Sequence, residues 1–321
     1  MNLRARLRDD HERVLLLDGG LATELEAQGA HLQGDPLWSA RLLHTNPQAI
    51  KAAHHSFLLN GADVITTATY QASIQGFVQH LGVSLDTARE LMASGLHLAV
   101  DAAMTFGSGK RARAVAASVG PYGAFLCDGS EYSGKYADKM SVEELKAWHR
   151  PQLECLAAAG ADVLALETIP SIKEAAALAE LLREFPNCNA WISFSCKDGA
   201  HLSDGSPLLD GIRVASRSTQ VLAVGVNCCP PELVEPLLDS VAALRGPDLK
   251  WVVYPNSGED WDAQRGWHSS GKTSATLPAL SDTWIKQGAA LIGGCCRIRP
   301  EEIGELRRHL HPMEKEADLE I

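Results

Sequence analysis

The chain has 321 residues, of which 45% are hydrophobic and 21% charged, and this ordinary composition excludes a disordered or fibrous protein. Lys and Arg number 29 against 40 Asp and Glu, and the net charge of -11 argues against nucleic acid or an anionic membrane as partner. No uncharged apolar run approaches the roughly 18 residues of a membrane span, and residues 1–13 are too charged for a secretory signal. We therefore expect a cytoplasmic protein whose eight cysteines are thiols or metal ligands.

Eight short apolar runs predict strands. Most are continuously apolar rather than alternating, which is typical of parallel strands covered by helices. The runs are Val14–Asp18, Ala62–Thr69, Ala114–Val119, Ala161–Glu167, Ala190–Ser195, Val221–Asn227, Trp251–Tyr254 and Ala289–Gly293.

Amphipathic runs between these strands predict helices, and Ser141 with Glu144 and Ser171 with Glu174 match the capping-box pattern. The alternation predicts a single-domain (β/α)8 barrel of the TIM type over residues 1–310, followed by a polar C-terminal tail, 311–321. A doubly wound open sheet is the alternative. The predicted helices are Pro47–Asn60, Leu85–Phe106, Val142–Ala159, Ile172–Phe185, Leu208–Ala215, Pro231–Leu244, Ala279–Gln287 and Glu301–Leu310.

The unusual residues of the chain follow the predicted strands. Because the active sites of barrels lie at the carboxyl ends of the strands, this placement indicates an enzyme. The strand ends carry Asp18-Gly19-Gly20, Thr66-Thr67-Ala68-Thr69-Tyr70, Gly120-Pro121-Tyr122-Gly123, Glu167-Thr168, Asn227-Cys228-Cys229, Tyr254-Pro255-Asn256-Ser257-Gly258-Glu259 and Gly293-Gly294-Cys295-Cys296.

Three of the cysteines are candidate metal ligands. Cys228, Cys295 and Cys296 end strands that are near neighbours in a barrel, and three thiolates suit zinc while leaving a fourth position for water or substrate. The two glycines before the cysteine pair permit the bend that lets both reach one ion. Buried core thiols or a strained vicinal disulfide are the alternatives. Cys229 stays ambiguous, because neighbours on an extended strand point to opposite faces.

Carboxylates and a long loop share the same rim. Asp18 and Glu167 end two strands there, with the Thr67 hydroxyl at a matching place. The two acids either bind a substrate ammonium group or serve as helix caps and salt-bridge partners. The glycine-rich loop 122–136 is either a lid or a solvated loop, and its acids and tyrosines would suit a cationic ligand.

These motifs carry a resemblance. From Val14 to Leu310 the chain resembles the homocysteine S-methyltransferase family of zinc-dependent barrels, and it looks most like the branch that uses S-methylmethionine or S-adenosylmethionine. Arg297 departs from branches that have glycine there, and we interpret it as a feature of the S-methylmethionine users. The specific motifs are Gly225-Val226-Asn227-Cys228 and Gly293-Gly294-Cys295-Cys296, supported by Leu17-Asp18-Gly19-Gly20 and Leu166-Glu167-Thr168.

The resemblance implies roles for individual residues. The zinc ligands would be Cys228, Cys295 and Cys296, and no catalytic group beyond this zinc site is implied. Asn227 would position the neighbouring ligand. The residues that would hold the amino-acid head of homocysteine are Asp18, Gly19, Thr67 and Glu167.

The resemblance also implies a reaction and its partners. A methyl group would pass from a sulfonium, S-methylmethionine in preference to S-adenosylmethionine, to zinc-bound homocysteine thiolate and give methionine. The missing cobalamin and folate modules, and the missing C-terminal arm of the betaine-using branch, favour a simple donor and a monomer. The alternatives are selenocysteine as acceptor, betaine as donor, or a non-catalytic zinc- or thiol-binding barrel in which Cys229 closes the metal site.

Overall fold

Eight parallel strands form the barrel of this computed structural model, which describes residues 3–8, 14–106, 113–244, 246, 249–262, 266–268 and 276–312. Their order is β1-β10-β7-β6-β5-β4-β3-β2, and a parallel bridge between Leu17 and Val64 joins the two end strands. The predicted barrel is therefore confirmed over the open sheet. The strands are β1 (Leu15–Leu16), β2 (Val64–Thr66), β3 (Ala114–Val119), β4 (Val163–Ile169), β5 (Asn189–Phe194), β6 (Val221–Asn227), β7 (Lys250–Tyr254) and β10 (Ala289–Ile292).

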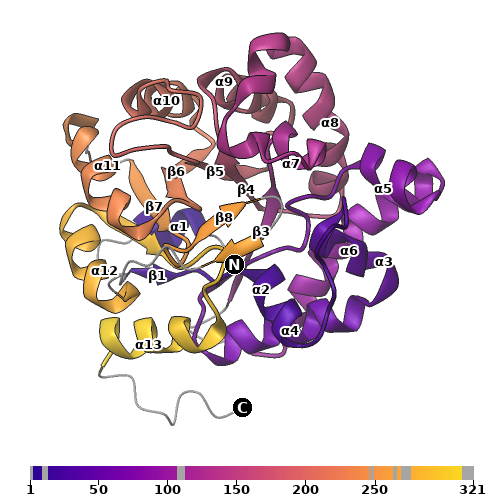
Figure 1. Ribbon diagram of the computed structural model, residues 1–321, viewed down its shortest axis with the longest axis horizontal. Coiled ribbons are helices and arrows are strands. Elements are labelled where there is room, and N and C mark those ends of the chain that lie inside the picture. Colours follow the sequence, from indigo (N-terminus) through magenta and orange to yellow (C-terminus); the bar gives the residue numbers. More distant parts are fainter. Residues whose placement is uncertain are drawn as a thin grey trace.

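Helices surround this ring of strands (Figure 1). All eight predicted helical segments are present, although the segment predicted as one helix over residues 231–244 is divided. Pro236 has no N–H to donate there, and only Val234–Ser240 is α-helical. The helices are α2 (Leu21–Ala27), α3 (Leu42–Thr45), α4 (Pro47–Leu59), α5 (Ile74–Leu81), α6 (Leu85–Met104), α7 (Tyr122–Leu126), α8 (Val142–Ala158), α9 (Ile172–Leu181), α10 (Leu208–Ala215), α11 (Val234–Ser240), α12 (Leu277–Lys286) and α13 (Pro300–Leu310).

Short 3-10 segments complete the connections. One of them replaces the last turn of a predicted helix. The helix predicted to continue to Phe185 stops at Leu181, where α9 ends, and a 3-10 segment follows. They are η1 (Trp38–Arg41), η2 (Ser130–Tyr132), η3 (Lys135–Lys139), η4 (Leu182–Glu184), η5 (Pro231–Leu233) and η6 (Ala242–Leu244). After β7, the strands β8 (Asp260–Asp262) and β9 (Gly266–His268) form an antiparallel pair outside the barrel.

Apolar side chains form two concentric layers. The larger cluster lies between the strands and the helices and includes Phe57, Phe77 and Trp284. A second cluster fills the barrel, where Trp191 and Val252 are buried. Continuous apolar strands supply both layers, because successive side chains point to opposite faces of a strand. This packing makes the barrel a rigid support for the residues at its rim.

The helix α1 (Leu3–Arg8) was not predicted, and it closes the amino end of the barrel. Leu3 and Leu7 join the cluster inside the barrel. The Arg4 guanidinium donates to the Asn189 side chain, Nε–Oδ1 3.1 Å, and to the Thr219 carbonyl oxygen, 2.8 Å. Both acceptors lie at the starts of strands. A segment that looked only charged therefore contributes two leucines to the core.

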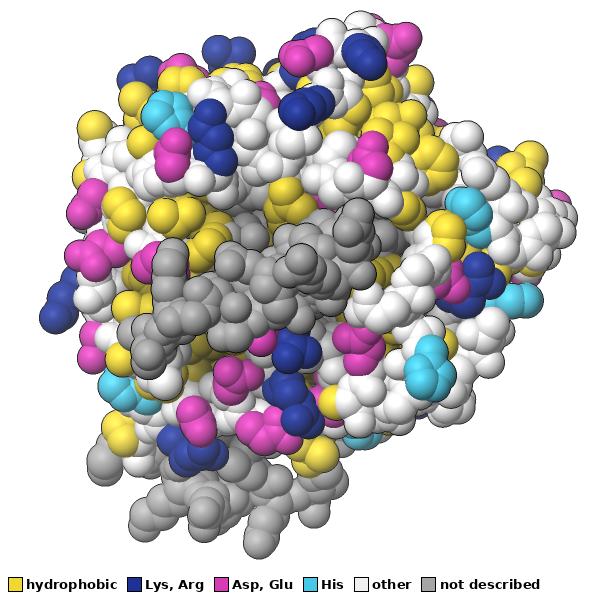
Figure 2. Space-filling view, in the orientation of Figure 1, with side chains coloured by type: hydrophobic (Ala, Val, Ile, Leu, Met, Phe, Trp, Pro, Cys, Tyr) yellow, Lys and Arg dark blue, Asp and Glu magenta, His cyan; other side chains and the backbone are white. Residues whose placement is uncertain are grey.

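The polar tail predicted for residues 311–321 lies almost wholly outside the described residues, which end at position 312. Among the helices that the structure describes, none is both long and apolar enough to cross a bilayer. Figure 2 shows the face of the molecule that is viewed in Figure 1. Acidic and basic side chains are interspersed on it, and hydrophobic side chains gather over α7 and α8.

Candidate active site

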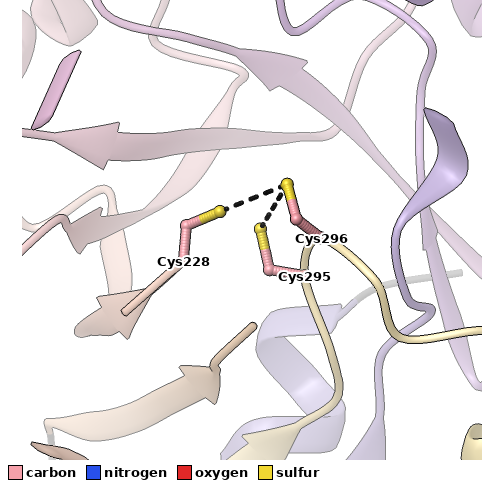
Figure 3. A group of neighbouring side chains, drawn as sticks. All are labelled: Cys228, Cys295 and Cys296. Carbon is pink, nitrogen blue, oxygen red and sulfur yellow. Dashed lines mark hydrogen bonds between the residues drawn. The ribbon is translucent and has the colours of Figure 1, made fainter. Parts of the chain in front are cut away.

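The three predicted cysteine ligands meet at the rim of the barrel. Cys228 follows β6, while Cys295 and Cys296 lie in the turn after β10, and their sulfur atoms point toward one another (Figure 3). The Sγ atoms of Cys228 and Cys296 are 3.5 Å apart, and those of Cys295 and Cys296 are 4.0 Å apart. All three lie within 4.8 Å of one another, so one ion can contact all of them.

The backbone is shaped to bring these sulfurs together. Cys228 has a φ of 52°, a left-handed conformation that is uncommon for a side-chain-bearing residue and clusters at functional sites. It is held by the bond from its N–H to the Tyr254 carbonyl oxygen, 3.1 Å. In the other turn, the N–H of Cys295 donates to the Pro255 carbonyl oxygen, 2.8 Å. A Cβ on Gly294 would collide with Ile298, so this close approach of two chain segments requires glycine.

The donor set fits a soft metal ion. Hydrogen bonds with Cys295 and Cys296 hold the pKa of Cys228 well below its usual range, while hydrogen bonding to Cys228 raises the pKa of the other two thiols. The three thiols together therefore stabilise one thiolate among them. Cys229 belongs instead to the core between barrel and helices, where burial raises its pKa to about 12. It is not part of the sulfur group, contrary to the alternative in which it closes the metal site.

Asp18 and Glu167 are buried beside this group with 3% and 8% of their surfaces exposed. Asp18 accepts from the Thr66 N–H, 2.7 Å, and Glu167 accepts from the Ser118 hydroxyl. Burial, with a contribution from the nearby Glu167 charge, raises the pKa of Asp18 to about 8, and burial raises that of Glu167 to about 7. Neither acid forms a salt bridge with any residue that the structure describes. A bound ammonium group would compensate both charges.

The other two residues predicted to hold the amino-acid head have different surroundings. The Thr67 hydroxyl accepts from the Ser118 N–H, 2.9 Å, and lies 2.5 Å from the Thr69 hydroxyl, so its hydrogen bonds are made within the protein. A Cβ on Gly19 would lie 2.5 Å from the Ile298 carbonyl oxygen, and this packing explains the glycine. Their contact with a ligand stays a prediction.

Asn227 ties the sulfur group to the end of β4. Its Oδ1 accepts from the Thr168 N–H and its Nδ2 donates to the Thr168 hydroxyl, both at 2.8 Å. These two bonds hold Thr168 at a φ of 62°, which a β-branched residue rarely adopts. Nδ2 also lies 4.0 Å from the Cys295 Sγ. Asn227 thus fixes the strand end that carries Glu167 relative to the cysteines.

Three further residues at the rim were not assigned roles from the sequence. Tyr132 places its hydroxyl 3.6 Å from the Cys228 Sγ, and its neighbour Glu131 has one buried carboxylate oxygen without a hydrogen-bond partner in the described part of the chain. Tyr70 hydrogen-bonds to Thr168 and lies near the charges of Glu131 and Cys228. The acids and tyrosines of the loop were the available signal, but the sequence did not say which of them face the cysteines.

A closed parallel barrel that gathers three thiols and two buried acids at the carboxyl ends of its strands belongs to the class of barrels able to hold a soft metal ion beside a cationic ligand. The family model described as homocysteine S-methyltransferase matches residues 15–310. The chain belongs to the homocysteine S-methyltransferase family.

Individual relatives agree over nearly the whole chain. A Bacillus subtilis homocysteine S-methyltransferase is 43% identical, covering 91% of this chain and 93% of its own. A Drosophila melanogaster betaine-homocysteine S-methyltransferase is 38% identical over 97% and 98% of the two chains. The metallated form of a homocysteine methyltransferase from Escherichia coli superposes with a TM-score of 0.84 at 41% identity, over 96% of this chain and 99% of that one. Overall similarity therefore does not separate methyl donors.

Proposed function

We propose that this protein is a zinc-dependent enzyme that transfers a methyl group from a sulfonium donor to the thiol of homocysteine and forms methionine. The observation that carries the proposal is the cluster of three thiols beside two buried carboxylates that have no salt-bridge partner among the described residues. The thiols suit a soft metal, and the carboxylates suit the ammonium group of an amino acid that also carries a thiol. Homocysteine has both groups.

The residues that would hold the metal are Cys228, Cys295 and Cys296, which leave a position for the acceptor thiol. Zinc held there would lower the pKa of that thiol, normally near 8.5, so that it is a thiolate at neutral pH. Three thiolates and one divalent ion give the site a charge of -1. This negative surrounding would keep the acceptor sulfur electron-rich.

The carboxylates would position the acceptor. Asp18 is held by Thr66 and Glu167 by Ser118, so both are fixed before the ligand arrives. A substrate ammonium between them would lower the pKa of both acids and stabilise their charged forms. Gly19 and Thr67 adjoin these acids in the proposed amino-acid site. Such fixed positioning can contribute about 7–11 kcal/mol to a displacement between two bound reactants.

The methyl transfer itself needs no proton. The thiolate lone pair forms the new sulfur–carbon bond, while the old one breaks and its electron pair stays on the donor sulfur. The donor leaves as a neutral thioether, so no general acid is required. S-methylmethionine is the donor that we favour over S-adenosylmethionine. We further propose a cytoplasmic monomer in which residues 1–310 form the catalytic domain.

The test combines metal analysis with product analysis. Purified, reduced protein is assayed for zinc and incubated with isotopically labelled homocysteine and S-methylmethionine. We expect about one zinc per chain and labelled methionine. S-adenosylmethionine and betaine are then compared as donors, and selenocysteine as acceptor. Zinc with no product from any pair would contradict the activity, and product from zinc-free protein would contradict the metal dependence.

A further inference from the structure

The segment that carries Glu131 and Tyr132 is fixed against the barrel. The Ser195 hydroxyl, at the end of β5, donates to the Glu131 carbonyl oxygen at 2.8 Å. On the other side of the segment, Gly123 packs so closely against Glu131 that an added Cβ would lie 2.6 Å from the Glu131 nitrogen. These contacts hold the backbone at Glu131 in place. The segment that carries Glu131 and Tyr132 therefore forms one side of the site.

A buried hydrogen-bond network holds the residues that flank this segment. Glu174 is fully buried, and its carboxylate accepts from the Tyr122 N–H at 2.8 Å and from the Tyr136 hydroxyl. The same carboxylate lies 2.8 Å from Nε2 of the buried His149. Tyr122 and Tyr136 flank the segment in sequence. Glu174 lies in α9, so it ties the residues on both sides of the segment to this helix.

The Glu131 carboxylate lacks a partner that its burial would require. Its Oε2 is buried and has no hydrogen-bond partner among the described residues. Burial is the main cause that raises its pKa to about 7, and the negative charge of Cys228 contributes. Glu131 is absent from the group whose ligand atoms lie within 4.8 Å of one another, so its carboxylate is not placed as a fourth ligand beside the sulfurs. A partly buried carboxylate whose buried oxygen has no hydrogen-bond partner among the described residues is stabilised by a cation that comes with a ligand.

Two tyrosines lie near this carboxylate and near Cys228. Tyr132 contacts Cys228 through its hydroxyl, yet 36% of its surface is exposed. Tyr70 lies near both Glu131 and Cys228, and Gly120 leaves room for its ring, because an added Cβ would lie 2.9 Å from it. The faces of such rings attract cations. Asp18 and Glu167 are buried more deeply, in the part of the site that we assign to the acceptor.

We propose that Glu131, with Tyr132 and Tyr70, forms the recognition site for the positive charge of the methyl donor, a sulfonium or quaternary ammonium group. This inference rests on the proposed function for the identity of the donor. The carboxylate neutralises the donor cation, and the tyrosines contact its methyl groups while Tyr132 also borders the sulfur site. When the methyl group leaves, the donor becomes neutral and loses its attraction to Glu131. Recognition is thereby specific for the donor before transfer.

The test compares Glu131→Gln with Asp138→Asn, which removes one negative charge from an exposed residue of the nearby segment η3. Glutamine preserves the shape of the side chain. We expect kcat/KM for S-methylmethionine to fall about 10- to 100-fold in Glu131→Gln, the range for a lost hydrogen bond to a charged group. The KM for homocysteine and the zinc content should stay within twofold of wild type. Asp138→Asn should match wild type throughout.

A binding titration without homocysteine separates this inference from the proposed function. S-methylmethionine is titrated into zinc-loaded wild type and both variants, and thermal melting checks that each variant is folded. Weaker binding by Glu131→Gln alone supports the inference even if no methionine forms. Equal binding by all three proteins, or no binding by wild type, overturns it. Parallel titrations with S-adenosylmethionine and betaine show whether a sulfonium or a quaternary ammonium is the preferred cation.

Discussion

A buried aspartate lies at each end of the barrel, and only one of the two has salt-bridge partners among the described residues. Asp63, before β2, is 4% exposed and forms salt bridges with Arg113 at 3.0 Å and Arg307 at 2.8 Å. Asp18, after β1, is 3% exposed, and its carboxylate accepts hydrogen bonds from Thr66 and has no salt-bridge partner among the described residues. The amino end is completed by the protein's own residues. At the carboxyl end the charged form of the acid is left for a ligand to stabilise.

Backbone strain follows the same division. The positive φ angles of Thr168 and Cys228 occur at the carboxyl end, where Thr168 is hydrogen-bonded to Asn227 of β6 and Cys228 to Tyr254 of β7. At the amino end, α1 seals the barrel with leucines and an arginine that has two acceptors. One end is optimised for stability and the other stores unfavourable charge and conformation for function. This difference predicts which substitutions change stability and which change activity.

The largest effect is expected at the sulfur group. Cys228→Ala should abolish stoichiometric metal binding and lower kcat/KM by at least about 10³-fold, because a metal site supplies several kcal/mol of activation. Cys229→Ala is the matched control, since the neighbouring thiol belongs to the core and should leave metal content unchanged. Metal analysis and steady-state assays measure both. A Cys228→Ala protein with wild-type metal and turnover would remove the cysteines from the mechanism.

The next effect tests the amino end. Asp63→Asn should lower the free energy of unfolding by about 3 kcal/mol, because it leaves two largely buried arginines without their carboxylate. Urea unfolding of the metal-free protein measures the loss. The KM for homocysteine, measured below the unfolding transition, should not change. A loss below about 1 kcal/mol would show that the ion pairs at this end do not stabilise the barrel.

The corresponding change at the carboxyl end should act on activity. Asp18→Asn retains an oxygen that can accept from the Thr66 N–H but removes the charge that we assign to the substrate ammonium group. We expect kcat/KM for homocysteine to fall about 10- to 100-fold. The free energy of unfolding should stay equal to that of wild type or rise. If Asp18→Asn lost as much stability as Asp63→Asn, the contrast between the two ends would fail.

The last prediction concerns pH, where the effect is a gradual slope and not a single loss. The folded-state pKa values, about 8 for Asp18 and about 7 for Glu167, are raised above the values of about 4 expected in the unfolded chain. The folded state therefore binds more protons between these values, and the stability of ligand-free protein should decrease as pH rises from about 4 to 8. Urea unfolding at several pH values measures this slope. It should be shallower in Asp18→Asn, and an unchanged slope would show that Asp18 does not cause it.

Much of the barrel could be predicted from the sequence alone. Continuous apolar strands require cover on both faces, and capping residues marked the starts of α4, α6, α8 and α9, so the order of elements followed largely from local patterns. The helices α1, α2, α3, α5 and α7 were missed, although Ser73 and the left-handed Gly82 at the ends of α5 are ordinary capping signals. Leu3 and Leu7 gave no such signal, because their burial depends on an open barrel end that only the assembled sheet creates.

The chemistry of the site divides in the same way. The sequence by itself determined that thiols, carboxylates and glycines follow the strands, since these motifs are contiguous in the chain. Only the tertiary structure decided that Cys229 faces the core, that Asn227 holds Thr168, and that Glu131 lies near the charge of Cys228. Strands and loops far apart in the chain make these contacts. Pairing and burial, which set charge and reactivity, are therefore properties of the folded barrel.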